Sequence, residues 1–250
     1  MKYHSDLIKD KKRVEAFNKT IDNYAHGIVY DLGTGSGILA KRASKNSDKV
    51  IAIEINPRTY KLAKKNLSQY DNIEVICADA TNIKLDYDAD VIICEMLDTA
   101  LIDEEQVPVI NNVLNYTNDQ TFFIPKAVIN TITLTYSKVT NITYIEDGKP
   151  QYEKLSDEVT YQEVHFNKKI KEDFDELLSL TVNKTARANS IKLTTYTLMG
   201  DGFVLEPTPM LNPPLIIPID EIPVEKGQTI RIQLKYNMGG GLNTVTTTIK

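Results

Sequence analysis

The chain has 250 residues, of which 42% are hydrophobic and 25% charged, and its formal net charge is -5 at pH 7. This length suits one large domain or two modest ones, and the composition is that of an ordinary globular protein. The acidic balance argues against a broad electrostatic grip on nucleic acid. No apolar run approaches the roughly 18 residues of a membrane span and no secretory leader opens the sequence, so we expect no membrane partner and a cytoplasmic location.

The first half of the sequence alternates between strand and helix patterns. Near-continuous apolar runs, typical of strands buried on both faces of a parallel sheet, lie at 27–33, 49–55, 73–79 and 90–96. Residues 57–69 begin with Pro57 and carry apolar residues at helical spacing, which predicts a helix. This alternation of strands and helices predicts an α/β sheet with right-handed crossovers.

A glycine-rich loop follows the first of these runs, in the segment VYDLGTGSGILA. Asp31 ends the strand, and Gly33, Gly35 and Gly37 lead into a helix. Small residues let the backbone approach a ligand closely, and a helix N-terminus offers unpaired N–H donors. The G-x-G-x-G spacing, continued by Ile38, differs from the fingerprint of a pyrophosphate-binding NAD site.

Two further acids follow the next two strands. Glu54 ends the second run, where a carboxylate can accept both hydroxyl groups of a ribose. Asp79 ends the third run in CADATN, where the acid and the neighbouring backbone can face an adenine edge. Because the carboxyl ends of parallel strands meet at one edge of the sheet, these acids and the glycine loop predict a single ligand site.

Through DLGTGSG, AIEINP and CADA, residues 25–115 resemble the class I S-adenosylmethionine-dependent methyltransferases. The resemblance implies a Rossmann-like sheet that binds S-adenosylmethionine, with the glycines under its methionine part and Glu54 on its ribose. The residues of this half that it assigns to the cofactor are Asp31, Gly33, Gly35, Gly37, Glu54, Asp79 and Ala80.

The fourth apolar run leads into an acidic segment, VIICEMLDTALIDEE, at 91–105. In this position the segment resembles the double-glutamate loop of the protein arginine methyltransferases, whose two glutamates stand nine residues apart, as Glu95 and Glu104 do. Two carboxylates can grip a guanidinium through charge-assisted hydrogen bonds and draw positive charge away from the attacking nitrogen. A solvated acidic loop is the alternative interpretation.

The N-terminal segment HSDLIKDKKR is similar to a second motif of that family, with His4, Asp10 and Arg13 in register. The resemblance implies that Arg13 holds the carboxylate of S-adenosylmethionine, a bidentate task that suits arginine. The alternative is a charged face of an amphipathic helix.

Strand-like segments separated by Gly and Pro fill the second half, with Pro125 as the boundary. The predicted fold is α/β: a Rossmann-like methyltransferase sheet in a cofactor-binding domain at 1–125, followed by a C-terminal antiparallel β-barrel-like substrate domain at 126–250. Residues 168–180 are predicted to be helical or mixed. The triglycine at 239–241 is predicted to be a turn.

Three features depart from the arginine methyltransferase pattern. Asn212 stands where that family has a histidine, and Met96 replaces the aromatic residue after the first glutamate. The segment 138–175 is too short for the family's helical dimerisation arm, so the usual arm dimer is not expected and the oligomeric state stays open. The segment NPPL at 212–215 superficially resembles the Asn-Pro-Pro-aromatic motif of amino-methyltransferases. That motif ends the fourth strand of the sheet, where this chain has CEML, so we interpret NPPL as a loop of the β half.

The sequence therefore predicts a methyltransferase that N-methylates an arginine-like guanidinium of a protein or peptide, with Glu95 and Glu104 as catalytic residues. The open alternatives are a small cationic metabolite, another residue type, or a non-catalytic S-adenosylmethionine-binding protein. Cys77 and Cys94 lie in apolar runs and are predicted to be buried free thiols. With three histidines and no cysteine cluster, no metal site is expected.

Overall fold

The structure, a computed structural model, describes residues 10–146 and 148–250. Five parallel strands form the first sheet in the order β3-β2-β1-β4-β5, which confirms the predicted α/β sheet. These strands are β1 (Ile28–Leu32), β2 (Lys49–Glu54), β3 (Ile73–Cys77), β4 (Val91–Cys94) and β5 (Phe122–Ile124). The helices of this half are α2 (Lys11–Tyr24), α3 (Ile38–Ala43), α4 (Pro57–Leu67) and α5 (Gln106–Val113), with 3-10 turns η1 (Thr99–Leu101) and η2 (Leu114–Tyr116).

The strand order reverses direction at β1, which has β2 on one side and β4 on the other. Connections that leave in opposite directions open a crevice at the carboxyl ends of these strands, where α/β sheets bind ligands. Leu32 is in register with Cys94 and with Ile53. The glycine loop, Glu95 and Glu54 therefore leave the sheet side by side.

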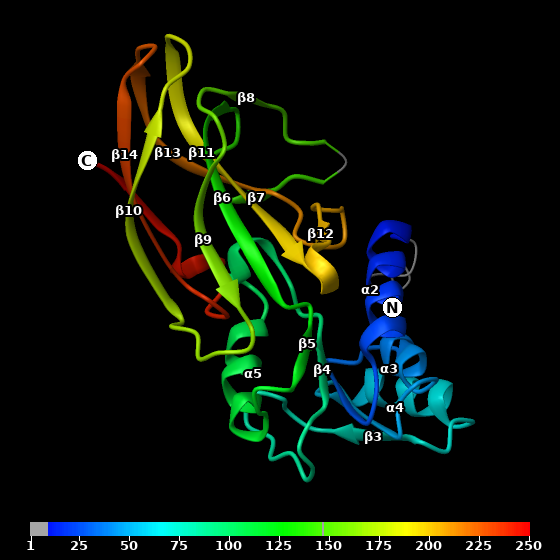
Figure 1. The fold of residues 1–250 in the computed structure, drawn as a ribbon. Coiled ribbons are helices and arrows are strands. Elements are labelled where there is room, and N and C mark those ends of the chain that lie inside the picture. The colour runs from blue at the N-terminus through cyan, green and yellow to red at the C-terminus, as the bar shows by residue number, and fades with distance from the viewer. Residues whose placement is uncertain (1–9, 147) are drawn as a thin grey trace.

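Two antiparallel sheets form the second half, and Figure 1 shows their long strands rising away from the parallel sheet. The seven-stranded sheet runs β7-β13-β11-β6-β8, with β12 on β11 and β9 on β6, and the three-stranded sheet runs β10-β14-β15. The strands are β6 (Ala127–Ser137), β7 (Thr143–Tyr144), β8 (Tyr152–Lys154), β9 (Val159–His165), β10 (Asp173–Thr181), β11 (Ala186–Leu198), β12 (Val204–Leu205), β13 (Leu215–Val224), β14 (Thr229–Asn237) and β15 (Thr246–Ile249).

The antiparallel half is confirmed, but the described strands do not close into a barrel. β9 pairs with β6 in the larger sheet, whereas β10, which follows it in the chain, pairs with β14 in the smaller one. The chain thus passes from the larger sheet to the smaller one at the β9–β10 connection, and the two sheets do not join there into one closed sheet. The triglycine lies between β14 and β15, as predicted.

The predicted helical or mixed character of 168–180 is wrong. Residues 173–181 form β10, which pairs with β14 along its whole length. Phe174 and Leu180 are buried while Asp175 and Glu176 are exposed. The spacing of the apolar residues fits both a helical period and a strand period. The segment forms a strand because β14 supplies hydrogen-bonding partners for its backbone.

The prediction of two buried thiols is half confirmed. Cys94 is buried at the end of β4, between β1 and β5, and burial raises the pKa of its thiol well above the ordinary value. Cys77 is exposed, contrary to the prediction. It is the last residue of β3, an edge strand that pairs on one side only, with β2, so its other side has no strand to cover it.

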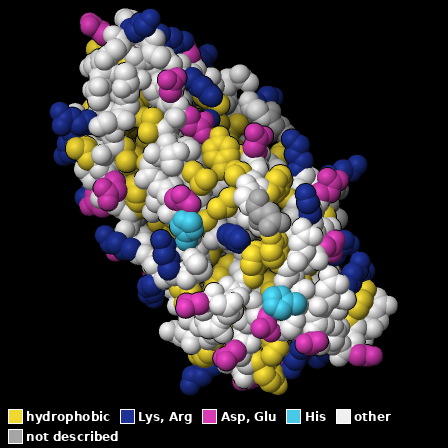
Figure 2. All heavy atoms as spheres, in the orientation of Figure 1, with side chains coloured by type: hydrophobic (Ala, Val, Ile, Leu, Met, Phe, Trp, Pro, Cys, Tyr) yellow, Lys and Arg dark blue, Asp and Glu magenta, His cyan; other side chains and the backbone are white. Residues whose placement is uncertain are grey.

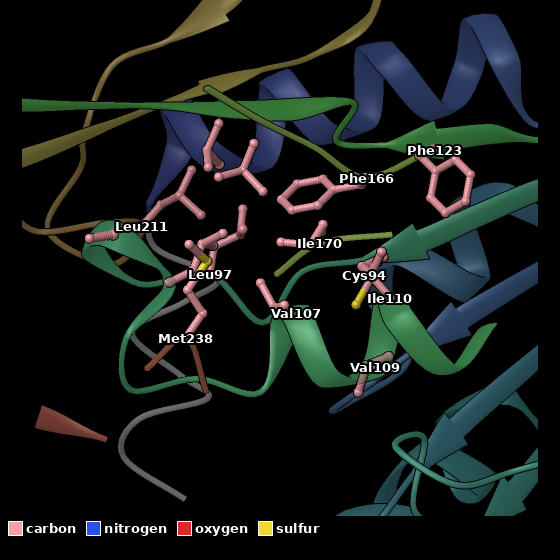
Figure 3. Packing of buried hydrophobic residues seen from close by; sticks show 14 of the residues in the cluster. Cys94, Leu97, Val107, Val109, Ile110, Phe123, Phe166, Ile170, Leu211 and Met238 are labelled. Atoms are coloured by element: carbon pink, nitrogen blue, oxygen red, sulfur yellow. The ribbon is translucent and has the colours of Figure 1, made fainter. Parts of the chain in front are cut away.

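One continuous core joins the two halves (Figure 3). Cys94 of β4 lies near Ile110 of α5, and the same cluster continues through Phe166 after β9 to Leu211 and Met238 of the β-rich half. The segment that follows β4 is therefore enclosed between the parallel sheet and the antiparallel sheets.

On the face drawn in Figure 2, basic and acidic side chains are interspersed and do not gather into a patch of one sign. This mixture fits the weakly acidic net charge of -5. In the portion of the chain that the structure describes, no helix has the length and apolar character needed to cross a membrane.

Candidate active site

A cavity of about 230 Å³ lies at the carboxyl ends of β1, β2 and β4. Most of the predicted site residues meet there. Those that line it are Arg13, Asp31, Gly33, Gly35, Glu54, Glu95 and Glu104, together with Met96 and, from the β-rich half, Met210. Acidic groups thus outnumber cations among the described lining residues.

The glycine loop passes close to the end of β4. Gly33 has a φ of +73°, and a Cβ atom there would lie 2.9 Å from the Met96 Sδ atom. A side chain at this position would therefore collide with the residue that follows Glu95, in a conformation that already disfavours L-residues. Glycine at this position lets the two strand ends converge on one cavity.

Asp31 fixes the loop to the helix that follows it. Its Oδ2 accepts hydrogen bonds from the Thr34 hydroxyl at 2.6 Å and from the Ala40 N–H in the first turn of α3 at 2.9 Å. Burial is the main reason why the pKa of Asp31 rises to about 6; the hydrogen bonds from Thr34 and Ala40 oppose the rise, and the nearby carboxylates of Glu95 and Glu54 add to it. The carboxylate therefore acts first as a local organiser of the cavity wall.

Glu54 holds the glycine loop from the other side. Its Oε2 accepts a hydrogen bond from the Gly35 N–H at 3.0 Å, and its Oε1 accepts one from the Asn56 N–H at 2.8 Å. The residue is buried although its carboxylate lines the cavity. Each carboxylate oxygen can accept a second hydrogen bond, so both can still take a hydroxyl group of a ligand.

Arg13 of α2 binds Glu95. Its Nε donates to Glu95 Oε1 at 2.8 Å, and its NH2 group donates to Oε2, so the pair is bidentate. Both side chains are mostly buried, which strengthens charge-assisted bonds of this geometry. The cation that the resemblance assigned to the cofactor thus also orients the first glutamate, a contact that the sequence did not predict.

Glu104 faces the same cavity from the far end of the acidic loop, which we define as residues 95–105. Burial raises the pKa of Glu104 above its ordinary range, and the charges of Asp103, Glu95 and Glu105 raise it further. A cation in the cavity would offset this repulsion. The carboxylates of Glu95 and Glu104 therefore make this part of the cavity favourable for a positively charged ligand.

The acidic loop is anchored on every side by hydrogen bonds. Ala100 and Leu101 have φ values of +61° and +59°, a conformation that non-glycine residues adopt only when surrounding contacts hold it. The contacts are Met96 N to Gln106 Oε1 (3.0 Å), Thr99 Oγ1 to Pro213 O (2.7 Å), Ala100 N to Thr195 Oγ1 (2.7 Å), Gly239 N to Leu101 O (2.9 Å) and Gly241 N to Ile102 O (2.9 Å). The loop is thus rigid and depends on the β-rich half.

Three groups of residues in this arrangement escaped the sequence analysis: Asp98, Gln106 and the triglycine turn. Asp98 belonged to the acid cluster, but nothing in the sequence distinguishes it from the exposed Asp103. Gln106 is fully buried two residues after Glu104. An amide so close to a predicted site is the only signal that the sequence offers, and it does not indicate burial. The turn at 239–241 had no sequence link to the loop at all.

Other predicted positions lie away from the cavity wall. Gly37 is the N-cap of α3 and packs against Leu67. Asp79 accepts hydrogen bonds from the backbone and side chain of Thr81, and Ala80 is buried beside them. The roles of Asp79 and Ala80 at an adenine edge and of Gly37 under the methionine part of the cofactor stay predictions.

Two positions singled out by the family pattern have different outcomes. His4 lies outside the described residues. Asn212 is buried with a φ of +51° and donates a hydrogen bond to Thr197 Oγ1 at 2.9 Å, while the cavity wall nearby is formed by Met210. No group of three or more His, Cys, Asp or Glu side chains suited to a metal ion occurs in the described parts of the chain.

Gly239 offers a test of the anchoring by the triglycine turn. Its φ is +80°, and a Cβ atom would lie 2.8 Å from the Pro108 ring. We expect Gly239→Ala to lower the free energy of unfolding by about 1–3 kcal/mol and to reduce catalytic turnover, because the bond to Leu101 is displaced. Chemical denaturation and an activity assay measure both effects.

Gly227→Ala is the matched control, since Gly227 has a φ of +87° and no neighbour within 4 Å of the added atom. It carries the backbone cost without the collision, so stability should fall less and turnover should not change. Equal losses of turnover in the two variants would contradict a role of the triglycine turn at the site.

Comparison with known proteins agrees with this geometry. The methyltransferase domain family matches residues 29–119. An uncharacterized protein of Methanothermobacter thermautotrophicus is 42% identical over 99% of this chain and 97% of its own length. Two solved structures share the fold over 99% of this chain and 96% of theirs: the Trypanosoma brucei PRMT1 enzyme-prozyme heterotetrameric complex with AdoHcy (TM-score 0.78, 16% identity) and protein arginine methyltransferase 10 of Arabidopsis thaliana (TM-score 0.79, 14% identity).

The residues of the cavity fit S-adenosylmethionine. The absence of a side chain at Gly33 and Gly35 leaves the loop backbone open to the ligand, and both oxygens of Glu54 can accept ribose hydroxyl groups. These three residues, with Arg13 for the carboxylate, are the ones that we expect to hold it. Because of the relative that matches over nearly its whole length and the matching domain, the chain belongs to one family with the Methanothermobacter protein and is a class I S-adenosylmethionine-dependent methyltransferase that resembles the protein arginine methyltransferases.

Proposed function

We propose that this methyltransferase N-methylates an arginine-like guanidinium of a protein or peptide, with Glu95 and Glu104 as the catalytic residues that grip it. One observation carries the proposal: both glutamates line the same cavity as the glycine loop, and Glu95 already holds a guanidinium, that of Arg13, through both of its oxygens. A cavity wall built for planar, bidentate cation binding favours a guanidinium over an ammonium.

The two carboxylates have complementary tasks in this proposal. When bound, S-adenosylmethionine supplies an electrophilic methyl group. Glu95, fixed by Arg13, orients the acceptor, while Glu104 accepts N–H bonds from it and concentrates electron density on the attacking nitrogen. Methyl transfer leaves S-adenosylhomocysteine and releases one proton from that nitrogen. In this proposal Glu104, whose pKa burial raises, accepts the proton.

Two features support a protein acceptor over a free metabolite. Met210 of the β-rich half closes one side of the cavity, so the acceptor binds between the two halves of the molecule. Both solved neighbours carry the name of protein arginine methyltransferases. A side chain on an extended peptide can enter such a cleft from outside.

Methyl-labelled S-adenosylmethionine and matched peptides test the proposal. Peptides that differ only in one Arg, Lys or Gln are compared with free arginine and other small guanidinium compounds, and the modified atom is identified by mass spectrometry. We expect transfer to the Arg peptide. Transfer only to small compounds would assign a metabolite, transfer to Lys or Gln another residue type, and cofactor binding without any transfer a non-catalytic binding protein.

The assembly of the protein gives a separate prediction. Residues 138–175 contain β7, β8, β9 and the start of β10, and the described part of this segment contains no helix. We therefore expect a monomer, or a dimer built without a helical arm, by small-angle scattering and light scattering. A dimer in which this segment packs on the partner's α/β half would contradict the prediction.

A further inference from the structure

Asp98 lies inside the acidic loop, between the two glutamates, and is 6% exposed. Its Oδ2 accepts hydrogen bonds from the Asp103 N–H at 3.0 Å and the Tyr144 hydroxyl at 3.2 Å, and its Oδ1 accepts one from the Glu104 N–H at 3.2 Å. A single carboxylate thus folds the loop back on itself and ties it to β7.

The hydrogen bond from the Glu104 N–H to Asp98 Oδ1 restricts the orientation of the Glu104 side chain. The backbone before it runs through Ala100 and Leu101 in the left-handed region, which persists only when neighbouring contacts over-determine it. Asp98 closes the turn that begins there and fixes two consecutive amides. Without this carboxylate, the segment that carries Glu104 keeps no described hydrogen bond from its own amide.

We propose that Asp98, oriented by Tyr144, is a positioning residue that holds the acidic loop in the conformation that places the Glu104 carboxylate in the acceptor cavity. The inference rests on the proposed function, because it takes Glu104 to grip the acceptor. Asp98 is not among the residues that line the cavity, so it acts through Glu104. Tyr144 belongs to β7, so a residue of the β-rich half supports the acceptor site through Asp98, without lining the cavity itself.

The hydrogen bonds call for the ionised form of Asp98. All three partners donate, and only the ionised carboxylate accepts without offering a proton of its own. Burial raises the pKa of Asp98 to about 7, and the groups that face it are Asp103 and Glu104 on its loop, Tyr144 on β7 and Tyr236 on β14. Burial raises the pKa of both tyrosines, so they stay protonated.

The direction of the pH dependence follows. As pH falls through about 7, Asp98 takes up a proton, its O–H group displaces one of the three donors, and the loop loosens. Turnover should therefore fall on the acid side of this value. Protonation of Glu104 acts in the same direction, so variants at Asp98 and Tyr144 are needed to separate the two groups.

Asp98→Asn is the main test. The amide keeps one acceptor oxygen but turns an NH2 group toward an N–H donor, so we expect kcat to fall roughly tenfold or more. Affinity for S-adenosylmethionine should stay within about twofold, and the acid limb near pH 7 should disappear. Tyr144→Phe leaves both backbone bonds, so turnover at high pH should persist while the acid limb moves to higher pH, because one donor to the ionised form is lost.

Asp103→Asn is the matched control in the same loop, because its side chain is exposed and no described contact holds it. It should leave the rate at high pH unchanged and move the acid limb only to lower pH, the direction opposite to Tyr144→Phe, because loss of the Asp103 charge lowers the pKa of Glu104. Wild-type rate and profile in Asp98→Asn would overturn the proposal. If Asp98→Asn does not fold, Tyr144→Phe decides alone: an unmoved acid limb overturns the proposal, and a shifted one supports it.

A crystal structure of Asp98→Asn with S-adenosylhomocysteine separates this inference from the proposed function. Displacement of Glu104 from the cavity supports the positioning role whatever the acceptor is. Glu104 in its original place overturns the role even if arginine peptides are methylated. Failure of the wild-type enzyme to methylate any guanidinium would reject the proposed function and leave this structural readout unaffected.

Discussion

We expect Glu95→Gln and Glu104→Gln each to lower the rate of methyl transfer by about two orders of magnitude, since about 1.4 kcal/mol of transition-state stabilisation corresponds to a factor of ten. Both glutamates line the cavity, and glutamine keeps the shape of the side chain while removing its charge. Single-turnover kinetics with the acceptor peptide measure the loss. Titration calorimetry should show cofactor affinity nearly unchanged.

The double variant should lose little more than either single one. Two carboxylates that grip one guanidinium act as a unit, so the loss of either lets the acceptor rotate out of line. Asp103→Asn and Glu105→Gln are the controls, because both side chains are exposed on the same loop. If all four substitutions gave equal effects, the acidic loop would be a solvated surface and the guanidinium proposal would fail.

Glu54→Ala should weaken the binding of S-adenosylmethionine and of its demethylated product by about 1–3 kcal/mol, roughly 5- to 150-fold. The variant removes acceptors for ribose hydroxyl groups and also releases the N–H groups of Gly35 and Asn56, so the glycine loop loses its support. Isothermal titration measures both affinities. Turnover at saturating cofactor should recover, which separates this effect from those of the acidic loop.

Glu74→Ala is a suitable control for Glu54→Ala. Glu74 lies on the neighbouring strand β3 and pairs at the surface with Lys49. Exposed pairs of this kind contribute little to stability, and Glu74 does not line the cavity. An unchanged affinity in a folded Glu54→Ala protein would remove Glu54 from the cofactor site.

Local patterns in the sequence determined the parallel half and the position of the site. Unbroken apolar runs require burial on both faces, and this condition is met by a parallel sheet covered by helices. Glycines and acids at the ends of these runs then fall at one edge, because parallel strands all point the same way. The cavity wall made by Gly33, Glu54 and Glu95 follows from that geometry alone.

Tertiary structure decided the contacts that join distant segments. The hydrogen bonds from Arg13 to Glu95 span 82 residues and that from Thr99 to Pro213 spans 114, so no periodicity or spacing along the chain could indicate them. The same holds for β10, which became a strand because β14 supplied its backbone partners. Sequence patterns report which side chains need burial, whereas buried polar groups take whichever partners the packed fold brings within reach, as Asp98 does with Tyr144.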